Sequence, residues 1–323
     1  MNHSLHDYDN IGDITRVFEP AKGHWKYSLL NLFLRVFVKW RHGLEVNVQS
    51  VRNLVEKQER QAPKQLPGID RIDVEEDEVS GEWLVPDDYH ENRVVLFLHG
   101  GAFIAASPNV YATMLAPWSQ TLGARAFMVD YRLAPEHPFP AASDDCVAAY
   151  KWLLKQGFAP KDIVIAGDSA GGNLVLGTLL QLKAEQTPLP GCAVLLSPFL
   201  DFTLSSRSGL TNARKDPVFT SAFAIGVRNH YAPGELHTDP RVSPLLGDFQ
   251  GLPPMLFQVG STEMLLDDSV RAVQKAKEAG VPVKLEIWEA LPHVFQSIDG
   301  LPQTKVAADQ ICEFIVQHTD WNE

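Results

Sequence analysis

The sequence predicts an α/β protein with a mostly parallel central sheet and helices on both of its faces. From about residue 70 to the C-terminus, short apolar runs rich in Val, Ile and Phe alternate with longer helix-like stretches. The chain has 323 residues, of which 45% are hydrophobic and 21% are charged. This composition excludes intrinsic disorder and fibrous repeats, and the length indicates one large domain, or one domain that carries a substantial insertion.

The expected elements follow from these runs in chain order. The parallel strands are predicted at 94–98, 126–129, 163–166, 193–196, 255–259 and 283–288, after an antiparallel lead-in hairpin at 72–76 and 82–85. The helices are predicted at 144–156, 170–185, 268–279 and 304–318. Gly157 and Gly280 come directly after two of these helices, where glycine favours the end of a helix.

Two segments do not fit the alternation. Residues 1–65 precede the sheet, and residues 201–245 separate two strands by more than a crossover helix needs. We expect both to form a helical cap over the carboxyl edge of the sheet, where open α/β sheets bind ligands. The remaining residues, 66–200 and 246–323, would form the α/β domain that holds the sheet.

The segment 27–40 has polar residues at four-residue spacing, which predicts an amphipathic helix. This helix could pack on its own protein, or it could touch substrate or a membrane surface. It is shorter than the roughly 20 apolar residues of a membrane span. We therefore expect no transmembrane segment.

Charge and cysteine content exclude several classes of protein. There are 28 Lys and Arg against 40 Asp and Glu, and the resulting net charge of −12 disfavours nucleic acid as a partner. Cys146, Cys192 and Cys312 lie in apolar stretches and are expected to be core residues in a reducing compartment.

Residues 1–10 lack the pattern of a secretory signal, so a cytoplasmic location is expected. No metal-ligand spacing, P-loop or dinucleotide motif is present, so neither a cofactor nor a metal is expected.

A candidate nucleophile lies between a strand and a helix. The strand 163–166 runs into Gly167-Asp168-Ser169-Ala170-Gly171-Gly172, which is a G-x-S-x-G motif in a strand–turn–helix context. Small neighbours two positions away allow the strained turn and leave the hydroxyl accessible. We expect Ser169 to be the nucleophile and the N–H of Ala170 to face a developing oxyanion. The alternative is a structural turn with an idle serine.

A second set of oxyanion donors is predicted after the strand 94–98. There, His99-Gly100-Gly101-Ala102 places two successive glycines in a turn, and the amides of Gly100 and Gly101 are expected to complete an oxyanion hole. His99 is expected to brace the turn.

A serine nucleophile needs a histidine base and a carboxylate that orients it. His293 follows the strand 283–288 and is the expected base. Glu263 follows the strand 255–259 closely and is the favoured acid, with Asp267 as the alternative. Asp267 and Asp268 also lie where a cap of the next helix is expected.

Four ordered motifs together resemble the bacterial hormone-sensitive-lipase-like esterases, the family IV carboxylesterases of the α/β-hydrolase superfamily. They are His99-Gly100-Gly101-Ala102, the segment 130–140 (DYRLAPEHPFP), Gly167-Asp168-Ser169-Ala170-Gly171-Gly172 and Leu291-Pro292-His293-Val294-Phe295. The resemblance implies an α/β-hydrolase fold with a cap, no cofactor, and a carboxylesterase that acts on short to medium acyl chains. It also implies structural roles for Asp168, Arg132, Glu136 and His137.

The chain departs from the family pattern at two positions. Ala102 stands where the family usually has a third glycine, and Glu263 stands where an aspartate followed by Pro-Leu is common. The resemblance also allows a homodimer, and the strand 283–288 could pair across it.

These motifs predict a mechanism in which His293 takes the proton of Ser169, an acyl-enzyme forms, and water releases it. Activity should fall at acidic pH as the imidazole becomes protonated. A serine amidase, a lipase and a non-catalytic small-molecule receptor remain the alternatives on this scaffold. Substrate contacts are expected from aromatic residues of the cap: Trp25, Phe33, Phe37, Phe202, Phe219 and Phe223.

Overall fold

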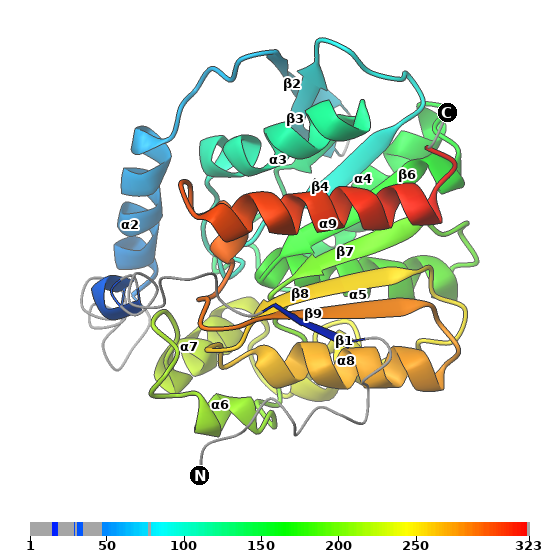
Figure 1. The fold of residues 1–323 in the computed structure, drawn as a ribbon. Helices are drawn as coiled ribbons and strands as arrows, with labels where there is room; N and C mark the ends of the chain where they lie inside the picture. Colours follow the sequence, from blue (N-terminus) through cyan, green and yellow to red (C-terminus); the bar gives the residue numbers. More distant parts are fainter. Residues whose placement is uncertain (1–14, 19–28, 30, 35–46, 77–78, 322–323) are drawn as a thin grey trace.

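The computed structural model describes residues 15–18, 29, 31–34, 47–76 and 79–321 (Figure 1). Its centre is a nine-stranded sheet in the order β1-β9-β8-β7-β6-β4-β5-β3-β2. All neighbours from β1 to β5 in this order are parallel, whereas β3 pairs antiparallel with both β5 and β2. The strands are β1 (Thr15–Phe18), β2 (Ile69–Glu76), β3 (Val79–Pro86), β4 (Val94–Leu98), β5 (Arg125–Val129), β6 (Ile163–Asp168), β7 (Cys192–Leu196), β8 (Met255–Gly260) and β9 (Val283–Trp288).

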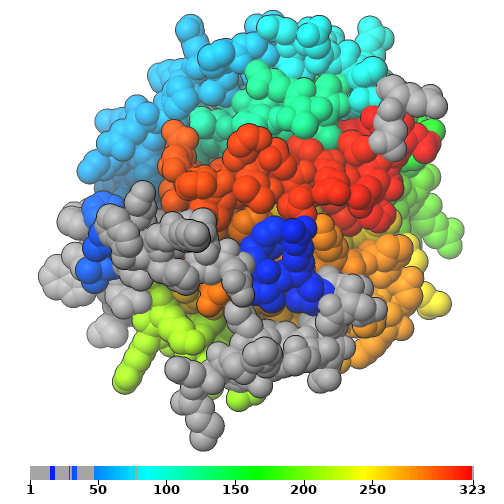
Figure 2. Space-filling model, viewed as in Figure 1, coloured from blue at the N-terminus to red at the C-terminus, as the bar shows by residue number. Residues whose placement is uncertain are grey.

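The eight predicted strands are confirmed, with ends shifted by at most three residues, and β1 is an addition. Thr15 is in register with Leu285, and the ring of Phe18 stacks on that of Trp288 at 3.9 Å between ring centres. Figure 2 shows β1 on the surface between α9 and α8. Since β9 pairs with β8 on one side and with β1 on the other, it has no free edge. The pairing of two copies through 283–288, which the sequence allowed, does not fit this arrangement.

Helices cover both faces of the sheet, as predicted. One face carries α4 (Ala141–Lys155), α5 (Ala170–Ala184) and α8 (Leu266–Glu278), and the other carries α3 (Pro108–Leu122) and α9 (Pro302–His318). Along β4, Leu96 and Leu98 join the core of the first face, whereas Val95 and Phe97 join the core of the second. This alternation buries every side chain of β4, which explains why the strand is a continuous apolar run. Helix α3, which contains Pro117, was not predicted.

The two segments outside the alternation contain helices at one end of the sheet. They are α2 (Val48–Gln61), α6 (Ser208–Thr211) and α7 (Ser221–Tyr231), all on the left of Figure 1. Of the predicted helix at 27–40, residues 29 and 31–34 are helical, and the rest lies outside the described residues. Leu29, Leu32 and Phe33 are each more than half exposed.

The three cysteines are buried and unpaired, which confirms them as core residues. Burial raises the pKa of the Cys312 thiol to about 12. Within the described part of the chain, no helix has both the length and the apolar character needed to cross a membrane. The same residues hold no cluster of His, Cys, Asp and Glu that could bind a metal ion.

Candidate active site

Ser169 occupies a strained turn between β6 and α5, with φ of 51° and ψ of −114°. The two glycines of its motif allow this turn to lie directly on β4. A Cβ atom on Gly171 would overlap the carbonyl oxygen of Leu98, and one on Gly167 would lie 2.6 Å from the same oxygen. Glycine is required at both positions because the backbones approach too closely for any side chain.

His293 and Glu263 continue from Ser169 as a hydrogen-bonded chain. The Nε2 atom of His293 lies 2.9 Å from Ser169 Oγ, and its Nδ1 atom lies 2.7 Å from Glu263 Oε2. An ionised carboxylate only accepts hydrogen bonds, so Nδ1 carries the proton and Nε2 can accept from the serine hydroxyl. Glu263 is fully buried, and the side chain of His293 is only 8% exposed. This geometry can remove a proton from Ser169.

The Glu263 carboxylate is also held on the side away from His293. Its Oε1 atom accepts hydrogen bonds from Ser197 Oγ at 2.7 Å and from the Gly260 amide at 2.5 Å. The Val294 amide donates to the same serine oxygen at 3.3 Å. Ser197 follows β7 and was not predicted as a site residue. Its place after a strand, at the edge where Ser169, Glu263 and His293 lie, was the available signal.

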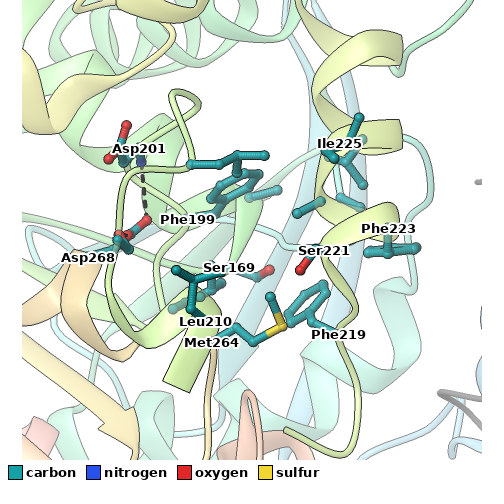
Figure 3. Close-up of a pocket in the computed structure, with 18 residues that line it drawn as sticks. Ser169, Phe199, Asp201, Leu210, Phe219, Ser221, Phe223, Ile225, Met264 and Asp268 are labelled. Atoms are coloured by element: carbon teal, nitrogen blue, oxygen red, sulfur yellow. Dashed lines mark hydrogen bonds between the residues drawn. The ribbon is translucent and has the colours of Figure 1, made fainter. Parts of the chain in front are cut away.

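The two aspartates that follow Glu263 accept hydrogen bonds from the 201–245 segment and from Leu200, the residue before it. Asp267 accepts from the Ser208 amide at 2.7 Å. Asp268 is buried and accepts from the amides of Leu200 at 2.8 Å and Asp201 at 3.1 Å, the latter drawn dashed in Figure 3. Burial raises the pKa of Asp268 to about 7. The structure therefore places Glu263, and not the alternative Asp267, against the imidazole.

The amide of Gly100 does not point toward a substrate oxygen. It donates to Asp168 Oδ1 at 2.7 Å, and a Cβ atom on Gly100 would overlap the other oxygen of that carboxylate. The Tyr111 hydroxyl lies 3.3 Å from the same carboxylate. Burial raises the pKa of Asp168 to about 6. The expectation that Gly100 serves the oxyanion hole is thus wrong here, because its N–H is already bonded, whereas the structural role expected of Asp168 fits these contacts.

Three neighbouring amides are available instead. The N–H groups of Gly101, Ala102 and Ala170 have no hydrogen-bond acceptor among the described residues. Ala102 and Ala170 line the same pocket as Ser169. Ala102 has φ of 57°, in the left-handed region, so the turn differs from ordinary extended or helical backbone.

The pocket beside Ser169 has a volume of about 200 Å³ and is mostly apolar (Figure 3). Phe219, Phe223 and Ile225 lie across it from Ser169. Its other apolar side chains are Ala102, Ala170, Phe199, Leu204, Leu210, Ala224, Val227, Met264 and Leu265. The Phe219 ring also packs edge-on against the imidazole of His293, with 4.5 Å between ring centres.

The aromatic residues expected at the substrate divide into three groups. Phe219 and Phe223 line the pocket. Phe202 is fully buried and stacks on Phe199, while Phe33 is described but more than half exposed. Trp25 and Phe37 lie outside the described residues.

Asp216 joins the 201–245 segment to the loop that carries Glu263. Its buried carboxylate accepts from the amides of Val218 at 2.8 Å, Phe219 at 2.9 Å and Met264 at 2.7 Å. Sequence reasoning missed this residue, because nothing local distinguishes it from an ordinary loop aspartate. Its contacts fix the position of Phe219, which packs on His293.

Comparisons with known proteins agree with this geometry. The sequence profile of the α/β-hydrolase fold family matches residues 95–297. The chain belongs to the α/β-hydrolase fold family. An esterase of Acinetobacter venetianus is 36% identical to this α/β hydrolase over 293 residues, which cover 90% of this chain and 96% of the relative.

Solved structures indicate which group of α/β hydrolases the chain belongs to. A crystal structure of an esterase from the bacterial hormone-sensitive lipase family matches with a TM-score of 0.84 and 36% identity, covering 93% of this chain and 99% of that one. The crystal structure of EstE5 soaked with p-nitrophenyl butyrate matches with a TM-score of 0.85 and 36% identity, covering 94% and 100%. This α/β hydrolase is therefore a carboxylesterase of the bacterial hormone-sensitive lipase family, as the motifs predicted.

Proposed function

We propose that Ser169, His293 and Glu263 are the catalytic triad with which this α/β hydrolase cleaves short- to medium-chain carboxylic esters. The observation that carries the proposal is the continuous chain of hydrogen bonds from Ser169 Oγ through both imidazole nitrogens to the buried Glu263 carboxylate, at 2.9 and 2.7 Å. A serine activated in this way suits acyl transfer.

In the proposed reaction, Ser169 Oγ attacks the ester carbonyl carbon while His293 Nε2 takes its proton. The carbonyl electron pair moves to oxygen, and its return breaks the bond to the alcohol, which leaves with the proton from His293. Water then attacks the acyl-enzyme by the same steps and releases the acid and Ser169. Glu263 holds the imidazole orientation and offsets the charge that His293 gains.

The oxyanion would accept hydrogen bonds from the amides of Gly101, Ala102 and Ala170. Their free N–H groups and the shared pocket of Ala102, Ser169 and Ala170 support this proposal. Gly100 is replaced in this role because its amide donates to Asp168.

The pocket supports a small apolar acyl or alcohol group as the bound part of the substrate. Its walls come mainly from residues 199–227. We propose that residues 1–65 and 201–245 act as the cap and that 66–200 and 246–323 form the catalytic domain. The limited volume of about 200 Å³ favours chains well below ten carbons.

A homodimer and a cytoplasmic location are further proposals. A dimer would need a surface other than the edge of β9, which β1 covers. Light scattering would report the oligomeric state. Three buried, unpaired thiols support a reducing compartment, and cell fractionation would test the location.

The first experiment compares initial rates on p-nitrophenyl esters of two to sixteen carbons for the wild type, Ser169→Ala and Glu263→Gln. Asp267→Asn is the matched control, since Asp267 is a neighbouring carboxylate that binds Ser208. We expect kcat to fall about 10⁴- to 10⁶-fold in Ser169→Ala, about 10⁴-fold in Glu263→Gln and little in Asp267→Asn. Full activity of Ser169→Ala would disprove the nucleophile, and a larger loss in Asp267→Asn than in Glu263→Gln would disprove the acid.

A further inference from the structure

Helix α2 contacts the rest of the protein through an apolar stripe, in which Val48 and Val55 flank Val51, and through charged side chains. Val51 is its one buried residue. Two residues, Arg52 and Glu59, reach from α2 to different parts of the core. Figure 1 shows α2 standing at the side of the molecule, next to the end of α3 and apart from the sheet. Its side-chain contacts therefore decide what this helix can influence.

Arg52 makes four hydrogen bonds that join two segments of the core. Its Nε atom donates to the Ile104 carbonyl at 2.8 Å, and Nη2 donates to the Ala134 carbonyl at 3.1 Å. Both terminal nitrogens also donate to the Glu136 carboxylate, at 2.7 and 2.6 Å. The guanidinium is thus fixed as a planar fork by three partners.

Ile104 belongs to the turn 101–105, which holds two of the amides proposed for the oxyanion. The amides of Ile104 and Ala105 both donate to the Gly101 carbonyl, at 3.1 and 3.0 Å. Ala102 and Phe103 follow each other with φ of 57° and 62°. Two consecutive non-glycine residues in the left-handed region are unfavourable and persist only where the surroundings hold them.

Two external donors hold successive carbonyl groups of this turn. The Ala134 amide donates to the Phe103 carbonyl at 2.8 Å, and Arg52 donates to the next carbonyl, that of Ile104. Since Arg52 also binds the carbonyl of Ala134, it fixes the turn and the segment that supports the turn. The direction of the peptide planes at 101–105 therefore depends on a side chain from α2.

We propose that Arg52 is a positioning residue for the oxyanion turn, through which helix α2 controls the rate of the chemical step. This inference rests on the proposed function, because it assigns the amides of Gly101 and Ala102 to the oxyanion. The contribution of such donors depends on their aim at the developing charge, and a misplacement of about 1 Å costs on the order of 100-fold in rate.

Glu59 provides a matched control on the same helix. Its carboxylate accepts from the Asn109 amide at 3.0 Å and from the Val110 amide at 3.4 Å, at the start of α3. Glu59 thus anchors α2 as Arg52 does but does not contact the turn 101–105. If docking of α2 is all that matters, substitutions of the two residues should affect activity equally.

The test compares the wild type, Arg52→Gln, Arg52→Lys, Glu136→Gln and Glu59→Gln. For each, kcat and KM are measured on p-nitrophenyl butyrate, together with the melting temperature and the inhibition constant of a trifluoromethyl ketone, whose serine adduct carries an oxyanion. We expect Arg52→Gln to lower kcat about 10- to 100-fold with KM within about twofold, and to weaken the ketone by a similar factor. Glu59→Gln should lower only the melting temperature, and Arg52→Lys and Glu136→Gln should be intermediate in kcat.

Equal kcat in Arg52→Gln and Glu59→Gln, or an effect confined to KM, would overturn the inference and leave the proposed function intact. Loss of the proposed function itself would appear separately, as activity that persists in Ser169→Ala. If Arg52→Gln does not fold, Arg52→Lys and Glu136→Gln test the role of Arg52 instead. The first keeps a positive charge beside the turn as an ammonium group, and the second keeps the guanidinium group itself. Unchanged kcat and unchanged ketone inhibition in both would then refute the role of Arg52.

Discussion

Asp268 is a buried carboxyl group whose ionisation opposes folding. It lies against the amides of Leu200 and Asp201 and the hydroxyl of Ser206, and burial raises its pKa to about 7. An aspartate in the unfolded chain has a pKa near 3.8. The folded protein therefore binds this proton more tightly than the unfolded chain does. Binding of this proton adds its full contribution to the free energy of unfolding below about pH 4. The contribution is lost as the pH rises to about 7.

Asp268→Asn should remove this pH dependence, because asparagine does not titrate. We expect the melting temperature of the wild type, relative to that of Asp268→Asn, to decrease as the pH rises from 4 to about 7 and to level off above that pH. Calorimetry of both proteins in the same buffers measures this difference. Other titrating groups, such as Asp168, cancel in the comparison. A constant difference across this range would show that Asp268 has an ordinary pKa.

Among single residues, the sequence predicted those that belong to motifs and missed those that connect distant segments. Ser169 and His293 were predicted because each follows a strand in a recognisable pattern. Ser197 and Asp216 were missed because their partners, Glu263 and Met264, lie 66 and 48 positions away in the chain. The role of Gly100 was misjudged because the direction of an amide depends on backbone angles that residue type alone does not set.

The turn from β6 into α5 is the element with the least tolerance for side chains. Gly171 lies in the first turn of α5 against the backbone of Leu98, where a Cβ atom would overlap the carbonyl oxygen. For Gly177, in the same helix, the one atom of the described residues close to the position of a Cβ atom is the Arg241 carbonyl oxygen, at 3.6 Å. The two glycines therefore differ in packing and not in secondary structure.

Gly171→Ala should destabilise the protein by about 3 kcal/mol or more, because β4 and α5 must separate to admit the methyl group. Gly177→Ala should stabilise it by about 0.5 to 1 kcal/mol, because alanine favours the helix and the site has room. Urea unfolding of both variants measures the change in the free energy of unfolding. Similar stability of the two variants would show that the close approach of α5 to β4 can relax.

Elements buried on both faces were easy to predict, and elements with weak local signals were not. The strands of the parallel sheet are short apolar runs, and their predicted ends are close to the observed ones. Helix α3 was missed, and it contains Pro117, a residue that usually indicates the end of a helix. Strand β1 has four residues, two of them exposed, and its pairing with β9 has no signature in the local sequence.

For the whole molecule, β1 completes the sheet by covering an edge that would otherwise be open. Without it, the backbone groups of β9 on that side and the face of Trp288 would be uncovered. Unpaired edges of this kind promote pairing with other chains. The fold therefore uses its own N-terminal segment to protect an interior strand.

Deletion of residues 1–18 should lower the melting temperature by several degrees and cause self-association that grows with concentration. Light scattering after gel filtration measures the association. Phe18→Ala is the control, since it removes the stacking on Trp288 but keeps the backbone of β1. A truncated protein with unchanged mass and melting temperature would show that β1 does not protect the edge.

The pairing of β1 with β9 also has a consequence for synthesis of the chain on the ribosome. Thr15 pairs with Leu285, and 285 − 15 places the partners 270 positions apart. At about 5 to 20 residues per second, the partner strand follows roughly 15 to 50 s after β1 has been translated. Of the nine described strands, β1 is thus translated first but can pair only after β9 has been made, and Val17 and Phe18 lack their native neighbours until then.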